Sequence, residues 1–261
     1  MVHPLPKQVN TYFSFSNSFS LLSLFFRIDN SINEICRKYE IQPKMSKYLT
    51  RLLDYEIVIV CDDSASMKSP IYDTERTRWD ELCSIVKIIL DIGVIFDSNG
   101  VDLYFLNRPA FNKVKDPKTI EQAFTSPSSG HASLPSLLTR IFQSKLAQRG
   151  RDKKLLVFVA TDADHEEHLP ELERVMQEER QMETTFVSFL LCNDDQTSGQ
   201  HLDRWDRTLM NVDVNENYRS EREKIRRCQQ QKDYPFSYGD YVMKVLVGAI
   251  VPQIDLLNEP L

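Results

Sequence analysis

The side chains best suited to binding chemistry lie directly after an apolar segment at residues 56–61. This segment is rich in β-branched residues, which is typical of a strand buried on both faces in a parallel sheet. Asp62, Ser64 and Ser66 then occupy alternate positions. Ligands bind in α/β proteins at loops that leave the carboxyl ends of strands, and Mg²⁺ prefers oxygen ligands. The pattern therefore fits a magnesium site, although the same residue types also cap helices and stabilise turns.

The rest of the chain predicts strands that alternate with helices. We expect strands at 56–61, 101–106, 155–160, 184–192 and 211–214, with a short edge strand near 111–114. We expect helices at 78–96, 133–148, 169–181, 201–210, 218–231 and 237–250. This alternation predicts an α/β fold with a mostly parallel sheet and helices on both faces. Three loops that hold residues 62–66, 129–133 and Asp162 should then meet at one edge of the sheet.

A strand followed by Asp-x-Ser-x-Ser resembles the metal-ion-dependent adhesion site of von Willebrand factor type A (vWA) domains. The resemblance extends from about residue 53 to residue 252. It implies a Rossmann-like fold with a mostly parallel central sheet and helices on both faces. It also implies a protein-binding module that holds Mg²⁺ or Mn²⁺ and catalyses no reaction.

The vWA site takes ligands from three loops, two of which match closely here. Asp-x-Ser-x-Ser corresponds to Asp62, Ser64 and Ser66, and the aspartate of the third loop corresponds to Asp162. The resemblance implies that Ser64 and Ser66 contact the metal directly, whereas Asp62 and Asp162 act largely through water or hydrogen bonds. One coordination position would remain for an Asp or Glu of a protein partner. Ala65 replaces the usual glycine, which is a modest change where φ is negative.

The second loop departs from the family. Its pattern, near Gly-x-Thr-x-Leu, aligns with residues 130–134 and puts Ala132 at the position of the metal-binding threonine. Ser133 can supply the oxygen instead if the loop shifts by one residue. If it does not, the site lacks one protein ligand and binds its metal weakly.

Other functions remain open from the sequence. Asp62 after an apolar strand resembles aspartyl phosphotransferases of the haloacid dehalogenase type, but those use Asp-x-Asp and the second position here is Ser64. There are two alternatives to a metal-binding vWA domain. One is a metal-dependent hydrolase or phosphotransferase, and the other is a vWA scaffold that has lost its metal. Two further patterns have simple structural explanations. A set of possible zinc ligands (Asp162, Asp164, His165, His168) is best explained as a solvated loop. A basic stripe (Arg219, Arg222, Arg226, Arg227) is best explained as a solvated helix face.

The net charge and the cysteine content indicate which binding partners and which cellular compartment to expect for this protein. The net charge is −6 without a basic block, so a nucleic-acid partner is not expected. The five cysteines are odd in number and irregularly spaced, which favours free thiols and a cytoplasmic protein. The apolar run at 19–28 is too short to span a membrane. Secretion is the alternative if that run acts as a signal.

The same patterns divide the chain into four parts. Residues 1–33 are a poorly defined N-terminal extension, and residues 34–55 are an N-terminal helix interrupted at Pro43. Residues 56–252 form the vWA-like domain, and residues 253–261 form a tail.

Overall fold

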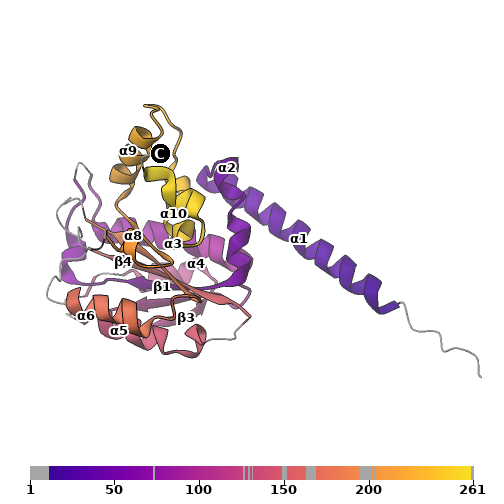
Figure 1. Cartoon of the computed structure of the whole chain (residues 1–261), viewed down its shortest axis with the longest axis horizontal. Coiled ribbons are helices and arrows are strands. Elements are labelled where there is room, and N and C mark those ends of the chain that lie inside the picture. The colour runs from indigo at the N-terminus through magenta and orange to yellow at the C-terminus, as the bar shows by residue number, and fades with distance from the viewer. Residues whose placement is uncertain are drawn as a thin grey trace, which may run out of the picture.

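A computed structural model describes residues 12–72, 74–125, 127–128, 130, 132–148, 152–162, 169–193, 202 and 204–259, with side chains from residue 26 onwards. A six-stranded sheet with the order β3-β2-β1-β4-β5-β6 forms its centre (Figure 1). The strands are β1 (Tyr55–Cys61), β2 (Val101–Phe105), β3 (Phe111–Val114), β4 (Lys154–Thr161), β5 (Thr185–Leu191) and β6 (Val212–Asn215). All neighbouring pairs are parallel except β2 and β3. The predicted α/β class and mostly parallel sheet are confirmed.

The direction in which the chain builds the sheet reverses between β1 and β4. From β1 the chain adds β2 and β3 on one side, and then β4, β5 and β6 on the other. A crevice at the carboxyl ends of the strands forms at such a switch point, and ligands bind there in open α/β sheets. β1 and β4 pair in register, with Cys61 opposite Ala160. The residues that follow these two strands are therefore neighbours.

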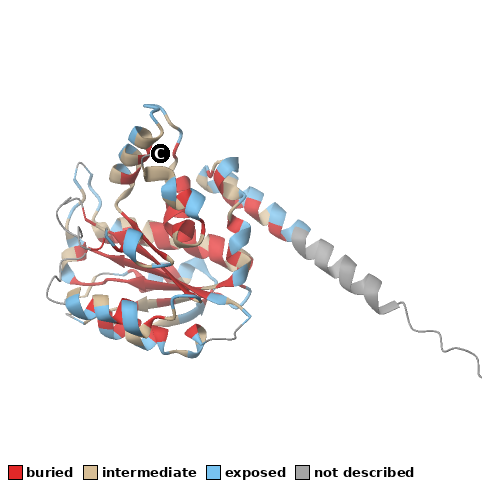
Figure 2. Ribbon diagram, in the orientation of Figure 1, coloured by how far each residue is buried: buried red, intermediate tan, exposed pale blue. Residues whose placement is uncertain are grey.

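Alternate residues of β1 face two separate apolar cores, because successive side chains of a strand point to opposite faces. Ile57 and Ile59 belong to the core under α3 (Arg78–Phe96) and α10 (Tyr238–Val247). Val58 and Val60 belong to the core under α5 (Leu134–Phe142) and α6 (Leu169–Arg174). Figure 2 shows the buried sheet between these helices. Because β1 is buried on both faces, its sequence is a continuous apolar run.

The helix that follows the first loop has a well-defined start. Thr77 accepts a hydrogen bond from the Asp80 backbone N–H, and the Asp80 carboxylate accepts one from the Thr77 backbone N–H. This capping box satisfies two N–H groups that the first helical turn leaves without partners. It places Arg78 as the first residue of α3, directly beside the carboxyl end of the sheet.

The N-terminal region differs from the prediction. A helix was expected from residue 34, but α1 spans Tyr12–Tyr39 and is followed by α2 (Pro43–Ser46) and a 3-10 helix (Leu49–Asp54). Ile28, Ile32 and Ile35 are buried, at the spacing of one helix face. The end of α1 thus packs on the domain, while the helix projects away from it (Figure 1).

Two of the remaining helices match predicted helices but are shorter: α8 (Trp205–Thr208) and α9 (Tyr218–Cys228). A π-helical turn (Val175–Glu179) ends α6. Two further helices were not predicted: α4 (Pro117–Ala123), and α11 (Pro252–Asp255), which lies where a tail was expected. Asp116 caps α4 by accepting from the Lys118 N–H. All five cysteines are free thiols. None of the described helices has the length and apolar character needed to cross a membrane.

Candidate functional site

The ends of β1 and β4 bring two buried aspartates together. Asp62 and Asp162 are 1% and 0% exposed. The Thr161 hydroxyl donates to Oδ2 of Asp62 at 3.0 Å. Burial raises the pKa of Asp62, and the negative charge of Asp162 raises it further. Two carboxylates therefore repel each other at the switch point of the sheet, where a cation would relieve the repulsion.

Two hydroxyl groups lie next to this pair. The Ser64 backbone N–H donates to Oδ1 of Asp62 at 2.9 Å, which folds the loop back on the strand. Oγ of Ser64 and Oγ of Ser66 are 2.9 Å apart. Ala65 lies outside the left-handed region, so its replacement of glycine causes no backbone strain. We call Asp62, Ser64, Ser66 and Asp162 the rim site.

Arg78 is a member of this region that the sequence analysis did not identify. Its Nη1 lies 3.1 Å from Oδ2 of Asp162, and its side chain is 15% exposed. The Asn193 amide donates to the backbone carbonyl of Asp162 at 2.8 Å, which fixes the third loop. The only sequence signal for Arg78 is a basic residue at the first position of the helix after the site. Its charge neutralises part of the negative charge of the aspartate pair.

Asp63 has a structural role next to the rim site. Its Oδ1 accepts from the backbone N–H and the side-chain amide of Asn107, at 2.8 and 3.0 Å. Its Oδ2 forms an ion pair with Nε of Arg108 at 2.8 Å. These contacts join the first loop to the end of β2. Asp63 is therefore fully paired, in contrast to Asp62, which faces another carboxylate.

The second loop is joined to this structural network. The Ala132 N–H donates to Oδ1 of Asn107 at 2.9 Å. A Cβ at Gly130 would lie 2.1 Å from the same oxygen, so only glycine allows this approach. Ser133 caps α5, accepting from the Ser136 N–H at 3.4 Å. No contact among the described residues joins Ser133 to the rim site, and its hydroxyl has a structural role at the start of α5.

The donor set of the rim site fits a hard cation. Two hydroxyls lie within hydrogen-bond distance of each other beside a buried, repelling carboxylate pair, and oxygen donors of this kind suit Mg²⁺. Asp164, His165 and His168 of the set of possible zinc ligands lie outside the described residues. In the basic stripe, Arg219 pairs with Glu223 at 3.8 Å on the exposed side of α9.

Comparison with known proteins gives no independent assignment. No protein-family model matches the chain, and a search of curated proteins found no match.

Proposed function

We propose that this chain is a vWA-like domain with a Rossmann-like fold that binds a protein partner and catalyses no reaction. In this proposal the rim site holds Mg²⁺ or Mn²⁺ through Ser64 and Ser66, with Asp62 and Asp162 behind them. The observation that carries the proposal is the pairing of two buried aspartates with two adjacent hydroxyls at the switch point. The free cysteines support a cytoplasmic location within the same proposal.

The chain orients each group of the rim site before any partner arrives. The Ser64 N–H and the Thr161 hydroxyl each hold one oxygen of Asp62, so the carboxylate cannot rotate freely. Asn193 donates a hydrogen bond to the backbone carbonyl of Asp162, and Arg78 donates one to its carboxylate. Preorganised polar groups reduce the entropy that binding must overcome. A bound divalent cation would supply a charge-assisted contact for an Asp or Glu of the partner.

A metal-free scaffold is the second candidate, and the Arg78–Asp162 ion pair favours it. The guanidinium provides a positive charge at the site without a metal. Arg78 could then bind a partner carboxylate itself, because its fork of donors matches carboxylate geometry. The two candidates share the acidic partner and differ in the need for metal.

Partner binding separates these candidates. The immobilised chain would be exposed to cell extract in Mg²⁺ or in chelator, and compared with Ser64→Ala/Ser66→Ala. Ser136→Ala is the matched control, because Ser136 is an exposed serine on α5. The proposal predicts proteins that are retained by wild type and the control in Mg²⁺ but lost with chelator or with the double variant. Retention unaffected by chelator and lost in Arg78→Gln would support the metal-free scaffold, and retention unaffected by any of these changes would contradict both.

A further inference from the structure

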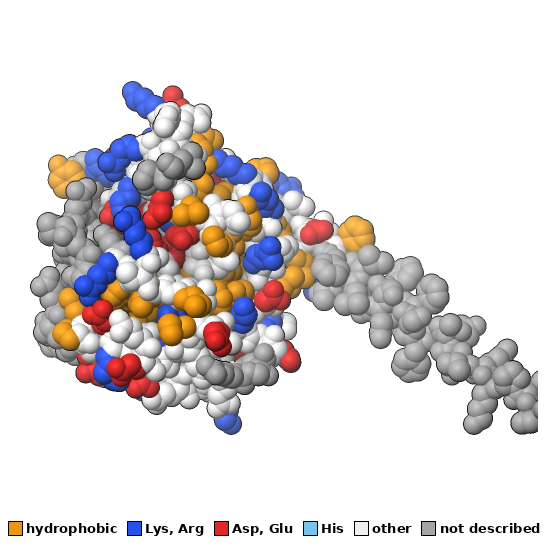
Figure 3. Space-filling view, in the orientation of Figure 1, with side chains coloured by type: hydrophobic (Ala, Val, Ile, Leu, Met, Phe, Trp, Pro, Cys, Tyr) orange, Lys and Arg blue, Asp and Glu red, His pale blue; other side chains and the backbone are white. Residues whose placement is uncertain are grey.

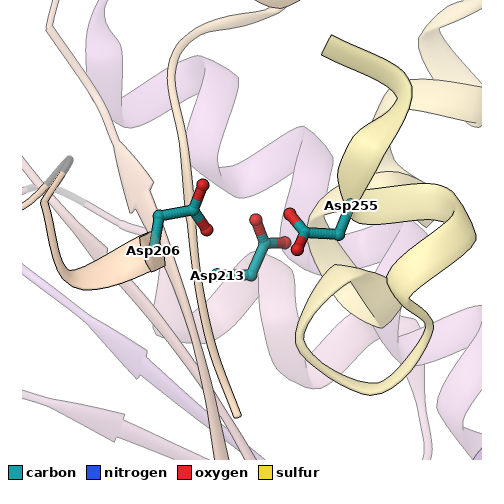
Figure 4. Close-up of side chains that lie close together, drawn as sticks. All are labelled: Asp206, Asp213 and Asp255. Carbon is teal, nitrogen blue, oxygen red and sulfur yellow. The ribbon is translucent and has the colours of Figure 1, made fainter. Parts of the chain in front are cut away.

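A second group of aspartates lies at the edge strand β6, three strands along the sheet from β1. Asp206 comes from α8, Asp213 from β6 and Asp255 from α11. One carboxylate oxygen from each lies within 4.8 Å of the other two. Figure 4 shows the three carboxylates pointing toward one another. We call these three residues the β6 cluster.

Asp213 is the fully buried member of the β6 cluster, and it is only partly satisfied. Its side chain is 0% exposed, and its Oδ1 accepts no hydrogen bond. Its Oδ2 accepts from the Asn215 amide at 2.9 Å. A Cβ at Gly248 would lie 1.7 Å from Oδ2, so a glycine makes room for the carboxylate. Buried polar atoms are nearly always hydrogen-bonded, and Oδ1 of Asp213 has only the distant charge of Lys244, at 3.9 Å. This oxygen therefore has room for a further ligand.

The buried Lys244 does not balance the charge of the cluster. Lys244 donates to Oδ1 of Asn215 at 2.7 Å, and its Nζ lies 3.6 Å from Oε2 of Glu221 and 3.9 Å from Oδ1 of Asp213. The ammonium thus faces Glu221 together with the three aspartates of the cluster.

The pKa values of the cluster reflect the same imbalance. Burial raises the pKa of Asp206 to about 6, with added repulsion from Asp213 and Glu259. Burial also raises the pKa of Asp255 to about 8, with added repulsion from Asp213 and Asp206 and a hydrogen bond between the Asp255 and Asp213 side chains. The positive charge of Lys244 lowers both values without cancelling the rise.

An open pocket gives access to this cluster. It has a volume of about 350 Å³ and is lined in part by Asp206, Lys224, Cys228, Asn258 and Glu259. Figure 3 shows acidic side chains gathered near α8 and α9, with Lys and Arg side chains around them. A hydrated cation could therefore reach Asp206 from solvent.

We propose that Asp206, Asp213 and Asp255 form a Ca²⁺ site that joins α8, β6 and α11. Ca²⁺ accepts several carboxylates in flexible geometry, whereas Mg²⁺ keeps most of its waters and uses one or two carboxylates. The ion gives Oδ1 of Asp213 a close ligand contact and adds to the positive charge that Lys244 supplies. This site is independent of the rim site and of its proposed function.

The test uses Ser64→Ala/Ser66→Ala as the background, so that the rim site does not contribute. Calorimetric titration with Ca²⁺ should show one bound ion and a raised melting temperature. Asp255→Asn in this background should weaken Ca²⁺ binding at least tenfold, and Asp206→Asn should do the same. Glu223→Gln is the matched control, because Glu223 is an exposed carboxylate on α9 that pairs with Arg219, and it should change the affinity less than about twofold.

Two results would overturn the Ca²⁺ site. The first is an absence of binding heat and of any melting shift in the background protein. Asp255 and Asp213 would then balance the cluster by sharing a proton. The second is equal Ca²⁺ affinity in the background protein, in Asp255→Asn and in Asp206→Asn. Far-ultraviolet circular dichroism of each variant confirms that a loss of binding is not a loss of fold.

Discussion

The rim site and the β6 cluster both bury aspartates close together, but the partners of these carboxylates differ between the two regions. At the rim, both oxygens of Asp62 accept hydrogen bonds, and Asp162 meets an arginine that water can reach. In the β6 cluster, Asp213 keeps an oxygen without a donor, and the nearby Lys244 is 0% exposed. The carboxylates of the rim site thus have hydrogen-bond and ion-pair partners within the chain. The β6 cluster is incomplete by itself, which suits an ion that stays in place.

The largest expected effect comes from removing the buried cation. Lys244→Met should lower the free energy of unfolding by about 3–5 kcal/mol, because it leaves Asp213 and Glu221 buried without their positive partner. Arg78→Met leaves Asp162 buried without its ion pair, but Arg78 itself is 15% exposed, so the loss should be smaller, about 1–3 kcal/mol. Urea unfolding of both variants measures the difference. Equal losses would contradict the contrast between the two regions.

The β6 cluster should make stability depend on pH when no Ca²⁺ is present. The pKa values of Asp206 and Asp255 are raised to about 6 and about 8, so the folded state binds protons that the unfolded state releases. Stability is then full below the ordinary aspartate pKa and falls as pH rises through these values. We expect a loss of about 1–3 kcal/mol between pH 5 and pH 9, reduced by solvent screening.

Unfolding in chelator at several pH values measures this loss, and Asp255→Asn should flatten its upper part. A wild-type protein whose stability rises steadily from pH 5 to pH 9 would show that the cluster carries no raised pKa.

Arg78 should weaken the affinity of the rim site for metal. Its guanidinium holds Oδ2 of Asp162 at 3.1 Å and repels an incoming cation. Arg78→Gln keeps a hydrogen-bond donor without the charge, so Mg²⁺ should bind about fivefold to tenfold more tightly, a gain of roughly 1 kcal/mol. Calorimetric titration measures this change, and Arg76→Gln, a change in a more exposed arginine nearby, is the control. Weaker Mg²⁺ binding in Arg78→Gln would mean that Arg78 positions Asp162 for the metal.

The smallest expected effect concerns Ser133. Because its hydroxyl caps α5, Ser133→Ala should lower stability by about 1 kcal/mol and leave Mg²⁺ affinity unchanged. Thermal unfolding and Mg²⁺ titration of the same variant measure both quantities. A loss of Mg²⁺ affinity would instead restore Ser133 as the ligand from the second loop.

The sequence alone predicted the strands of the sheet and the positions of the first and third loops of the rim site. β1 and β4 are apolar on both faces, which is a local signal, and parallel pairing then puts Asp62 beside Asp162. The start of α1 was missed because its buried face is narrow and begins only at Ile28 among the described side chains. α4 was missed although Asp116 and a following proline mark its start.

Long-range partners were beyond the sequence analysis. The ion pair of Arg78 with Asp162 depends on how α3 meets the sheet, and nothing in the local pattern specifies it. The β6 cluster joins three segments that are separated in the sequence. Nothing in the local sequence distinguishes Asp213 from any other residue of a short strand. Their burial and their missing donors are visible only in the folded chain.

Magnesium titration decides whether the rim site binds a metal. Asp255→Asn is the background, so that the β6 cluster does not contribute. The account predicts one Mg²⁺ ion bound to this protein and to its Ser136→Ala control, and no measurable binding to its Ser64→Ala/Ser66→Ala form. Equal binding in all three proteins would place the metal elsewhere. An absence of binding in all of them would contradict the metal site and favour the metal-free scaffold, in which Arg78 supplies positive charge.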